Sequence, residues 1–378
     1  MRDATLLQGR FVMASRRNLL DSMPRSAVIF VSSLSAVILG LLICGVMLLV
    51  TGKDPIAAYR TILETGLTGN KLLEMLKRST PLILSATAVA IGFKMNLFNI
   101  GVEGQYLFAA LIAAEAATHI SAPPVLHVLL TLLIASAAGA FWASIAAMLK
   151  ITRGINEVIS TIMLNFISLS VMQWLFDNYM RDDSDGGLRV TTTEIAPSGR
   201  IPDIAEGRLN GMWLVALFVV FCYWLIVFRS KFGFRLRSSG LNSTAAQTVG
   251  IAANRMIIVA MLLSGAIAGL VAMQSVVGEE YAYGPQATPT GFGFAGIAVA
   301  LLGRNNPVGI VVAAMLFGFL DSTSAVLQLS GIPNSIVKVI QAVVVLSVVI
   351  VNEATSRYMN RRTAEQTAAA LRAEKATV

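Results

Sequence analysis

Long stretches without a charged residue are the feature that most limits what this chain can fold into. Residues 26–50, 158–176, 209–228 and 256–278 each lack Asp, Glu, Lys and Arg, and about 20 apolar residues are enough for a helix to cross the hydrocarbon core of a bilayer. Only 13% of all residues are charged, against about a quarter in soluble domains. The sequence therefore predicts an all-α, polytopic transmembrane helix bundle embedded in a lipid bilayer.

The spacing of the apolar runs predicts about ten spans, some of them short or broken. The predicted spans are residues 26–50, 79–93, 97–118, 125–149, 157–178, 211–228, 256–277, 291–302, 306–326 and 333–352. Two of them, 79–93 and 291–302, are short and adjoin Gly, Asn or Pro, as broken helices at the substrate path of transporters do. Residues 54–78 mix charges with apolar residues and predict an amphipathic helix on the outer surface.

The net charge of +8 is unevenly distributed along the chain. The N-terminal lead, the loop at 229–255 and the C-terminal tail are basic, whereas the loop at 181–208 carries six acidic residues against four Arg. Because basic loops face the cytoplasm, we expect both termini inside, with a cytoplasmic lead (1–25), a membrane domain (26–352) and a cytoplasmic tail (353–378). The basic charge thus reflects topology, and no nucleic-acid partner is expected.

A polar stretch, "FKMNLFNIGVEGQ" (93–105), interrupts the first apolar runs. It contains Asn96, Asn99, Glu103 and Gln105. A charged side chain at the centre of a spanning helix costs about 2.5–3.5 kcal/mol and normally faces protein or a water-filled cavity. Two interpretations stay open: a helix break near the cytoplasmic surface, with Asn96 and Asn99 as N-caps, or the end of a half-helix that lines a translocation path.

A second polar stretch, "GINEVISTIMLNF" (154–166), begins with Asn156 as the expected N-cap of a span. Glu157, Thr161 and Asn165 then recur every four residues, which places them on one face of the helix. Interhelical hydrogen bonding would explain the hydroxyl groups alone. With Glu157 and Asn165 included, the pattern favours a polar pathway or gate over packing alone.

The basic loop at 232–255 contains signals for a short helix. Asn242 or Ser243 can cap it, residues 243–249 form about two turns, and Gly250 supplies a left-handed stop. An ordinary loop with one helical turn is the alternative interpretation.

Several kinds of chemistry are not expected from the sequence. No G-x-x-x-x-G-K-[ST] loop is present, so the chain is not expected to hydrolyse ATP. "GFGFAG" (291–296) matches G-x-G-x-x-G but lies in an apolar run without a preceding strand, which favours close helix packing over a dinucleotide site. With two His residues in the chain, neither a metal site nor a catalytic set of side chains is expected.

Four motifs together resemble the permease subunits of bacterial ABC importers for nucleosides and simple sugars, a group related to ribose and branched-chain amino-acid permeases. The motifs are "LFNIGVEGQ", "GINEVISTIMLN", the loop pattern G-x-N-x-x-A-A-x-x-x-G-I and "GFGFAGIAVALLGRNNPVG". The likeness covers residues 79–352. It implies the ABC importer permease fold and the bacterial plasma membrane as the location.

The resemblance also implies partners and roles. The partners would be a second homologous permease subunit, a cytoplasmic ABC ATPase that binds ATP and Mg²⁺, and an extracytoplasmic substrate-binding protein, with no cofactor in this chain. The loop helix is similar to the helix that couples such permeases to the ATPase, and the residues that match are Gly240, Asn242, Ala245, Ala246 and Gly250. One departure is Gln247, where older importer families keep a Glu.

The implied function is inward transport of a purine nucleoside or related small polar solute by a transport subunit that is not itself an enzyme. Four aromatic residues near the polar stretches could stack on a base, although packing is the ordinary role of such residues: Phe98, Tyr106, Phe166 and Trp174. The alternatives are an importer of the same class for a simple sugar or riboflavin, and an ion-coupled secondary transporter that acts alone.

Overall fold

The computed structural model of the chain describes residues 25–50, 52–184, 189–205, 207–285, 288–329 and 331–376. Apart from Arg25, the predicted N-terminal lead lies outside these residues. The N-terminal half contains α1 (Arg25–Val50), α2 (Pro55–Gly66), α3 (Gly69–Lys94), α4 (Val102–Thr118), α5 (Pro124–Arg153), α6 (Glu157–Leu175), the π-helical turn η2 (Phe176–Met180) and the 3₁₀ turn η3 (Pro197–Gly199).

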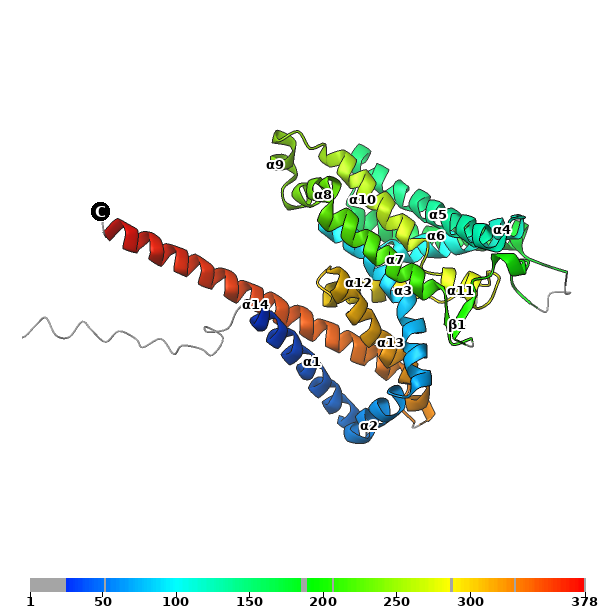
Figure 1. The fold of residues 1–378 in the computed structure, drawn as a ribbon, viewed down its shortest axis with the longest axis horizontal. Coiled ribbons are helices and arrows are strands. Elements are labelled where there is room, and N and C mark those ends of the chain that lie inside the picture. Colours follow the sequence, from blue (N-terminus) through cyan, green and yellow to red (C-terminus); the bar gives the residue numbers. More distant parts are fainter. Residues whose placement is uncertain are drawn as a thin grey trace, which may run out of the picture.

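The C-terminal half begins with a two-stranded antiparallel hairpin and continues as helices (Figure 1). Its elements are β1 (Asp203–Ala205), β2 (Leu209–Asn210), α7 (Met212–Trp224), the π-helical turn η4 (Leu225–Arg229), α8 (Lys231–Leu241), α9 (Ser243–Thr248), α10 (Ala253–Ala268), α11 (Met273–Gly278), α12 (Phe292–Leu302), α13 (Pro307–Leu329) and α14 (Asn334–Ala376).

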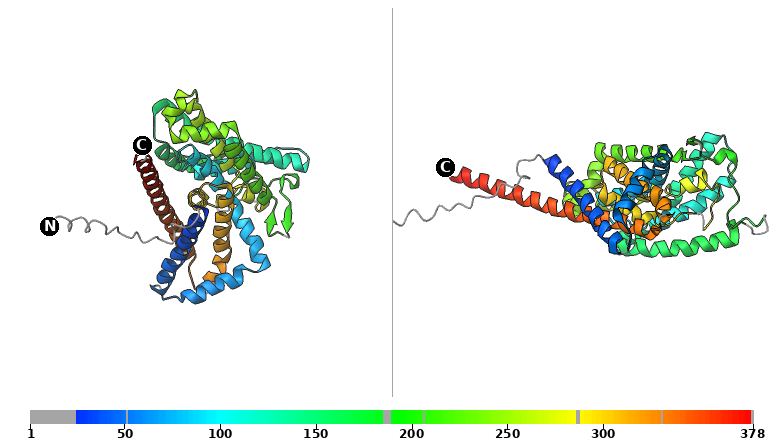
Figure 2. Two further views of the ribbon diagram at one scale, coloured as in Figure 1. Left: turned by 60° about the vertical axis from the view of Figure 1, so that its left-hand side comes forward. Right: turned by 90° about the horizontal axis from the view of Figure 1, so that it is seen from below.

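The helices form one large apolar core and one smaller core. The large core joins α3, α4, α5, α7 and α10 to α12 and α13. At the crossing of α5 and α10, a side chain at Gly139 would overlap the backbone of Gly265, so small residues let the two backbones meet, as is usual in membrane bundles. The smaller core joins α1, α2, α13 and α14, and α14 continues beyond the bundle to the C-terminal end (Figure 2).

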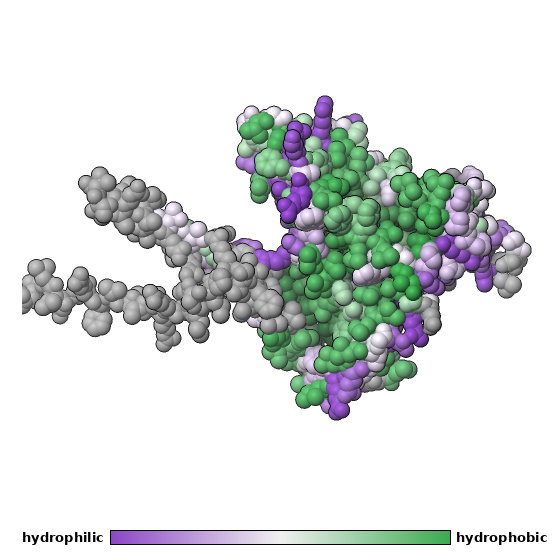
Figure 3. All heavy atoms as spheres, in the orientation of Figure 1, coloured by the Kyte–Doolittle hydropathy of each residue, from purple (hydrophilic) through white to green (hydrophobic). Residues whose placement is uncertain are grey.

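The prediction of an all-α, polytopic membrane bundle is confirmed. Among the described residues, six helices are long and apolar enough to cross a membrane: Pro124–Arg153, Glu157–Met180, Met212–Arg229, Ala253–Gly278, Pro307–Leu329 and Ser335–Met359. The total of about ten spans stays a prediction. In Figure 3, apolar residues cover the middle of the face shown, and hydrophilic residues gather near α8 and α9, near the hairpin and at α2.

Two predictions for the region before the polar break are wrong. The helix that contains the short span expected at 79–93 is longer than predicted, because α3 has 26 residues and begins at Gly69. Residues 54–78 are not one surface helix, because the chain turns at Leu67 and Thr68 and the second charged part continues directly into the apolar part of α3. Lys71, Glu74 and Arg78 make this possible, since they pair with one another along one side of α3.

The second short span is confirmed. α12 has 11 residues, and it begins after Gly291, whose φ of 92° is left-handed. The segment predicted at 256–277 is interrupted between α10 and α11. Broken helices therefore meet inside the bundle, although at partly different positions from those expected.

Candidate functional site

The break between α3 and α4 is organised around one buried amide. Asn99 is only 1% exposed, and its Nδ2 group donates to Gln105 Oε1 at 3.0 Å and to Ser264 Oγ at 2.8 Å. Asn99 Oδ1 accepts from Gln105 Nε2 and from the backbone N–H of Gly101, both at 3.0 Å. Ser264 in turn donates to the carbonyl of Ala88 at 2.7 Å. We call Asn99, Gln105 and Ser264 the amide cluster, and it joins the break to α3 and α10.

The expected capping roles of Asn96 and Asn99 are wrong. α4 begins at Val102 with Gly101 as its N-cap residue, because the chain first forms a turn in which Asn99 accepts from Gly101. Asn96 is exposed and follows the end of α3 with a left-handed φ of 58°, a conformation that Asn tolerates better than most residues.

Glu103 lies in the first turn of α4 and caps a different helix. Its Oε1 accepts from the backbone N–H of Gly291 at 2.6 Å and from the hydroxyl of Tyr106 at 2.8 Å. Its Oε2 accepts from the N–H of Gly293 at 2.7 Å. These N–H groups belong to the start of α12, where a helix has no intrahelical acceptors and favours negative charge. Glu103 therefore supplies the N-terminal cap of α12 from a distance of almost 190 residues in the chain.

The polar residues of α6 divide into two groups. Asn165 faces the break, where its Oδ1 accepts from the N–H of Gly104 at 2.9 Å and its Nδ2 donates to the carbonyl of Ile100 at 3.0 Å. Thr161 is buried and donates to the carbonyl of Glu157 at 2.6 Å. The Glu157 carboxylate pairs with Lys150 at 2.5 Å at the end of the helix. Asn165 is thus hydrogen-bonded to the break, and Thr161 packs against Gly101 in the same break.

Asn156 and the aromatic candidates do not converge on one point. Asn156 caps α6 at an exposed position, as predicted, by accepting from the N–H of Val158 at 2.8 Å. Phe98, Phe166 and Trp174 are exposed, and Tyr106 is fully buried. Phe98 lies within the break, where its ring contacts Phe93, and the hydroxyl of Tyr106 donates to Glu103 and to the carbonyl of Pro289.

A cavity of about 510 Å³ lies at the other end of α3. Its walls come from the first turns of α3, from α11, from the turn before α12 and from α13. The apolar part of the wall includes Pro81, Val271, Pro289 and Phe292. The charged part consists of four cations and three carboxylates: Lys71, Lys77, Arg78 and Arg208, with Glu74, Glu279 and Asp321. A cavity with apolar walls and a few converging polar groups is the usual form of a small-molecule site.

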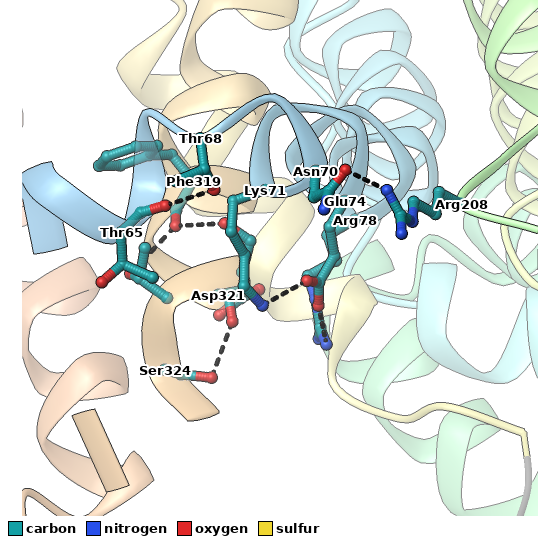
Figure 4. Close-up of polar contacts among 12 residues, drawn as sticks. Thr65, Thr68, Asn70, Lys71, Glu74, Arg78, Arg208, Phe319, Asp321 and Ser324 are labelled. Carbon is teal, nitrogen blue, oxygen red and sulfur yellow. Dashed lines mark hydrogen bonds and ion pairs between the residues drawn. The ribbon is translucent and has the colours of Figure 1, made fainter. Parts of the chain in front are cut away.

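Glu74 is at the centre of the charges on α3 (Figure 4). Its carboxylate pairs with Lys71 Nζ at 2.6 Å and with Arg78 Nη2 at 2.8 Å. Burial alone would raise the pKa of the Glu74 carboxyl, but the hydrogen bonds and charges of Lys71 and Arg78 outweigh it and hold the pKa below its ordinary value of 4.5. Glu74 therefore carries a negative charge in the cavity wall at neutral pH.

The opposite side of the cavity contains further paired groups. Lys77 pairs with Glu279 at 3.3 Å, and Gln274 Nε2 donates to the same carboxylate at 3.0 Å. Gln274 is only 7% exposed, and its Oε1 has no hydrogen-bond partner among the described residues. Asp321 of α13 accepts from Gln341 Nε2 at 2.8 Å. Figure 4 shows Asp321 beside Lys71 and Arg208 beside Asn70.

The cavity residues were not among the candidates from the sequence. One signal was present: Lys71, Glu74 and Arg78 are spaced three and four residues apart, so they share one face of a helix. That pattern is also typical of a helix on a membrane surface, and from the sequence alone it predicts such a helix. The other wall comes from segments about 200 residues further along the chain, and no local pattern links them to α3.

The loop helix has the bounds and caps that the sequence predicts. Asn242 Oδ1 accepts from the N–H of Ala245 at 3.0 Å, α9 follows, and Gly250 has a left-handed φ of 81°. Gly240 lies so close to the carbonyl of Lys94 that a side chain there would overlap it. This contact ties the loop to the end of α3, next to the break.

One residue of the loop set predicted from the sequence, Ala246, is not exposed. Ala246 is only 3% exposed and packs inward, whereas Leu241 and Val249 are 89% and 73% exposed. Ala245 is also exposed. Leu241 and Val249 therefore place exposed apolar side chains on both sides of α9, and the helix itself also exposes Ser243, Thr244, Gln247 and Thr248. Among the described residues, no group of three His, Cys, Asp or Glu side chains is placed to hold a metal ion.

Comparison with known proteins gives a consistent set of relatives. The family described as "Branched-chain amino acid transport system / permease component" matches residues 71–349. A guanosine ABC transporter permease protein of Bacillus subtilis is 38% identical over 83% of this chain and 91% of its own length. A glucose ABC transporter permease protein of Haloferax volcanii is 32% identical over 86% of this chain and 87% of its own.

A third relative is a nucleoside ABC transporter permease protein of Lactococcus lactis, which is 31% identical over 84% of this chain and 90% of its own length. No solved structure matches the chain.

Proposed function

This chain belongs to the branched-chain amino acid transport system permease family, and we propose that it is the membrane-spanning subunit of an ABC importer that moves a purine nucleoside inward. The observation that carries the proposal is the similarity over most of the chain to permeases named for guanosine and nucleosides. The cavity supports it, because about 510 Å³ lies within the range of small-molecule pockets, roughly 300–1,000 Å³.

In this proposal, ATP hydrolysis occurs in a separate cytoplasmic subunit and the present chain supplies no catalytic group and no cofactor site. A second, homologous permease would complete the pathway, and an extracytoplasmic binding protein would deliver the solute. The chain would lie in the bacterial plasma membrane with both termini in the cytoplasm. The basic loop 229–255 supports this orientation, in which α9 would lie on the ATPase side and the cavity on the outer side.

The loop around α9 is the proposed contact with the ATPase. Leu241 and Val249 present apolar side chains to the outside of the bundle, and exposed apolar groups in a basic loop favour a protein partner. Gly240 connects this contact to the end of α3, so a movement of the ATPase would reach the break directly. Residues 26–352 then form the permease domain, between the predicted lead and tail.

Transport by the reconstituted importer tests the function. We expect the complete complex, assembled with its ATPase, second permease and binding protein, to import radiolabelled guanosine only with ATP. Unlabelled nucleosides should compete, and glucose and riboflavin should not. Competition by glucose alone would instead favour the sugar importer, which the relative from Haloferax volcanii supports as a second candidate. Uptake by this chain alone on an ion gradient would overturn the proposal.

The ATPase contact has its own test. Val249→Asp places a charge on the exposed face beside α9, so we expect loss of ATPase co-purification and at least about tenfold slower import, because a charge without a partner in an apolar contact is costly. Val125→Asp is the matched control, since Val125 is equally apolar and exposed but begins α5 on the proposed outer side. Full ATPase binding by Val249→Asp would remove this loop from the interface.

A further inference from the structure

Residues 289–293, which we call the wall segment, lie between the cavity and the first turn of α4, which directly follows the polar break. Pro289 and Phe292 line the cavity. On the other side of the same segment, Glu103 accepts from the N–H groups of Gly291 and Gly293. The wall segment therefore has the cavity on one face and the first turn of α4 on the other.

Three polar side chains hold the backbone of the wall segment. Besides Glu103, Tyr106 donates to the carbonyl of Pro289 at 3.1 Å and Ser85 donates to the carbonyl of Phe292 at 2.7 Å. The wall segment and α4 are in close contact, because a Cβ atom at Gly293 would lie 2.8 Å from the backbone nitrogen of Glu103 and would push the two segments slightly apart. Hydrogen bonds to an ionised group are stronger than those between neutral groups, so the carboxylate makes the strongest of the three contacts.

The contacts of Glu103 differ from those of the amide cluster in their access to water. Pro289 and Gly291 are exposed, and Glu103 is only partly buried. When the wall segment moves, water from the cavity can replace the hydrogen bonds that its exposed groups lose. The free-energy cost of opening is therefore small. Asn99 is 1% exposed, and water cannot reach its partners in the same way. Among the donors to Glu103, Gly291 is exposed, whereas Gly293 and Tyr106 are buried. The contact through Glu103 is thus closer to water than the amide cluster and is the easier of the two to open.

We propose that Glu103 is a positioning residue that latches the wall segment shut between the cavity and the break, and that solute passes when this latch opens. The proposal rests on the proposed transport function and names the element that controls it. Tyr106 supports the latch, since its hydroxyl joins the Glu103 carboxylate to the carbonyl of Pro289.

The accessibility of a thiol behind the wall segment tests the latch without any knowledge of the solute. Ser264 is fully buried and belongs to the amide cluster, so Ser264→Cys places a small reporter there. The two native cysteines, Cys44 and Cys222, are first replaced by Ala. The complete importer in vesicles is then treated from outside with a membrane-impermeant maleimide, and the rate of labelling is measured.

In the reporter background, Glu103→Ala should raise the labelling rate about tenfold or more, because two charge-assisted hydrogen bonds that close the segment are lost. Glu103→Gln keeps one carbonyl acceptor and should give an intermediate rate. Glu115→Ala is the matched control: Glu115 lies on the same helix and pairs with exposed His119 at the other end, so labelling should not change. Unchanged labelling in a folded Glu103→Ala importer would make Glu103 a structural cap and overturn the latch.

A disulfide lock provides a second test if Glu103→Ala does not assemble. A Cβ atom at position 293 would lie 3.0 Å from Cβ of Glu103, about half an ångström below the range of about 3.5–4.5 Å found in disulfides, so a small outward shift of the wall segment allows the bridge. In Glu103→Cys combined with Gly293→Cys, oxidation should abolish ATP-driven guanosine import and suppress ATP-independent guanosine leakage. After reduction, the rate of leakage should be at least about tenfold higher than in the oxidised form, because neither a disulfide nor the Glu103 carboxylate then holds the wall segment.

The outcomes separate the two proposals. Import by the oxidised double variant at the rate of the reduced form would overturn the latch and leave the transport function in place. If the wild-type complex does not import guanosine, the proposed substrate is wrong, and the labelling of Ser264→Cys still decides whether Glu103 closes the segment.

Discussion

The two polar regions of this apolar bundle are built from different chemistry. The amide cluster at the break uses neutral side chains and backbone groups, and each polar atom of Asn99 has a partner. The cavity wall uses ion pairs around Glu74 and Glu279, and it leaves Gln274 Oε1 without a partner among the described residues. Neutral networks suit a site without water, whereas ion pairs are tolerated where water can solvate them.

The difference indicates separate roles for the two regions. Loss of a partner in the buried network leaves polar groups unpaired in a low-dielectric interior, which costs stability. Loss of a partner in the cavity changes the charge that a solute meets, while water replaces the missing contact. Substitutions at the break should therefore affect folding first, and those in the cavity should affect transport first.

The largest effect is expected from Asn99→Leu. This change leaves the Gln105 amide and the Gly101 N–H without partners, so we expect a loss of about 3–5 kcal/mol in stability and poor assembly. The measurement is the thermal midpoint of the purified permease, together with its yield in the membrane. Asn70→Leu is the same substitution at an exposed position in the cavity, and its midpoint should stay close to that of the wild type. Equal losses in both variants would abolish the distinction between the regions.

The next effect concerns transport rather than stability. Glu74→Gln removes the carboxylate that pairs with Lys71 and Arg78, so the cavity gains one positive charge. We expect import to slow about three- to tenfold, while stability falls by only about 1 kcal/mol, as for ion pairs near water. Initial rates of guanosine import in vesicles measure this.

Glu64→Gln is the control for Glu74→Gln, because Glu64 pairs with Arg60 on α2 at a well-exposed position. Its import rate should equal that of the wild type. If the Glu74→Gln importer transported at the wild-type rate but had a much lower thermal midpoint, the cavity residues would, like those of the break, mainly support folding.

Local signals account for what the sequence could predict. α9 follows from an Asn cap and a left-handed Gly within nine residues, and the structure has both. The polar stretches at 93–105 and 154–166 do meet, through Asn165 and Gly104. Such features depend on neighbours in the chain or on the high cost of polar groups in a membrane, and a sequence displays both.

The remaining features depend on pairs that are distant in the chain. Glu103 was a candidate from its polarity, but its partners Gly291 and Gly293 lie 188 and 190 positions away. The charges on α3 were visible, yet their interpretation as a surface helix was wrong, because they line a cavity whose other walls include α11 and α13. Stacking roles for Phe98, Phe166 and Trp174 stay predictions, and all three side chains are exposed.

External pH should have a smaller effect on import, and this effect should arise from the Glu74 carboxyl group in the cavity wall. The pKa of Glu74 is below its ordinary value of 4.5 in the folded chain. A carboxyl group with a lowered pKa contributes stability above its unfolded pKa, and this contribution is lost as the pH falls through the lower, folded pKa. Import should therefore be unaffected by this group from about pH 7 to about pH 5 and decline only below 4.5.

The pH profile of Glu74→Gln checks this assignment, because the variant has no carboxyl group to titrate at that position. Its import should lack the decline that the wild type shows below pH 4.5. The same decline in both importers would assign it to another group, such as one on the binding protein.

The smallest effect is expected from Asn96→Gly. This variant distinguishes the contribution of the exposed turn at the break to stability from that of the buried amide cluster. Asn96 is exposed and has a left-handed φ of 58°, a conformation that Gly adopts without strain. We expect a change in stability within about 0.5 kcal/mol, whereas Asn96→Val should cost about 1–2 kcal/mol, because a β-branched residue is strained there. The thermal midpoints of the two variants, measured beside Asn99→Leu, give the comparison. If Asn96→Gly lost as much stability as Asn99→Leu, the exposed turn would stabilise the break as strongly as the amide cluster does, and burial would no longer explain the difference between the two polar regions.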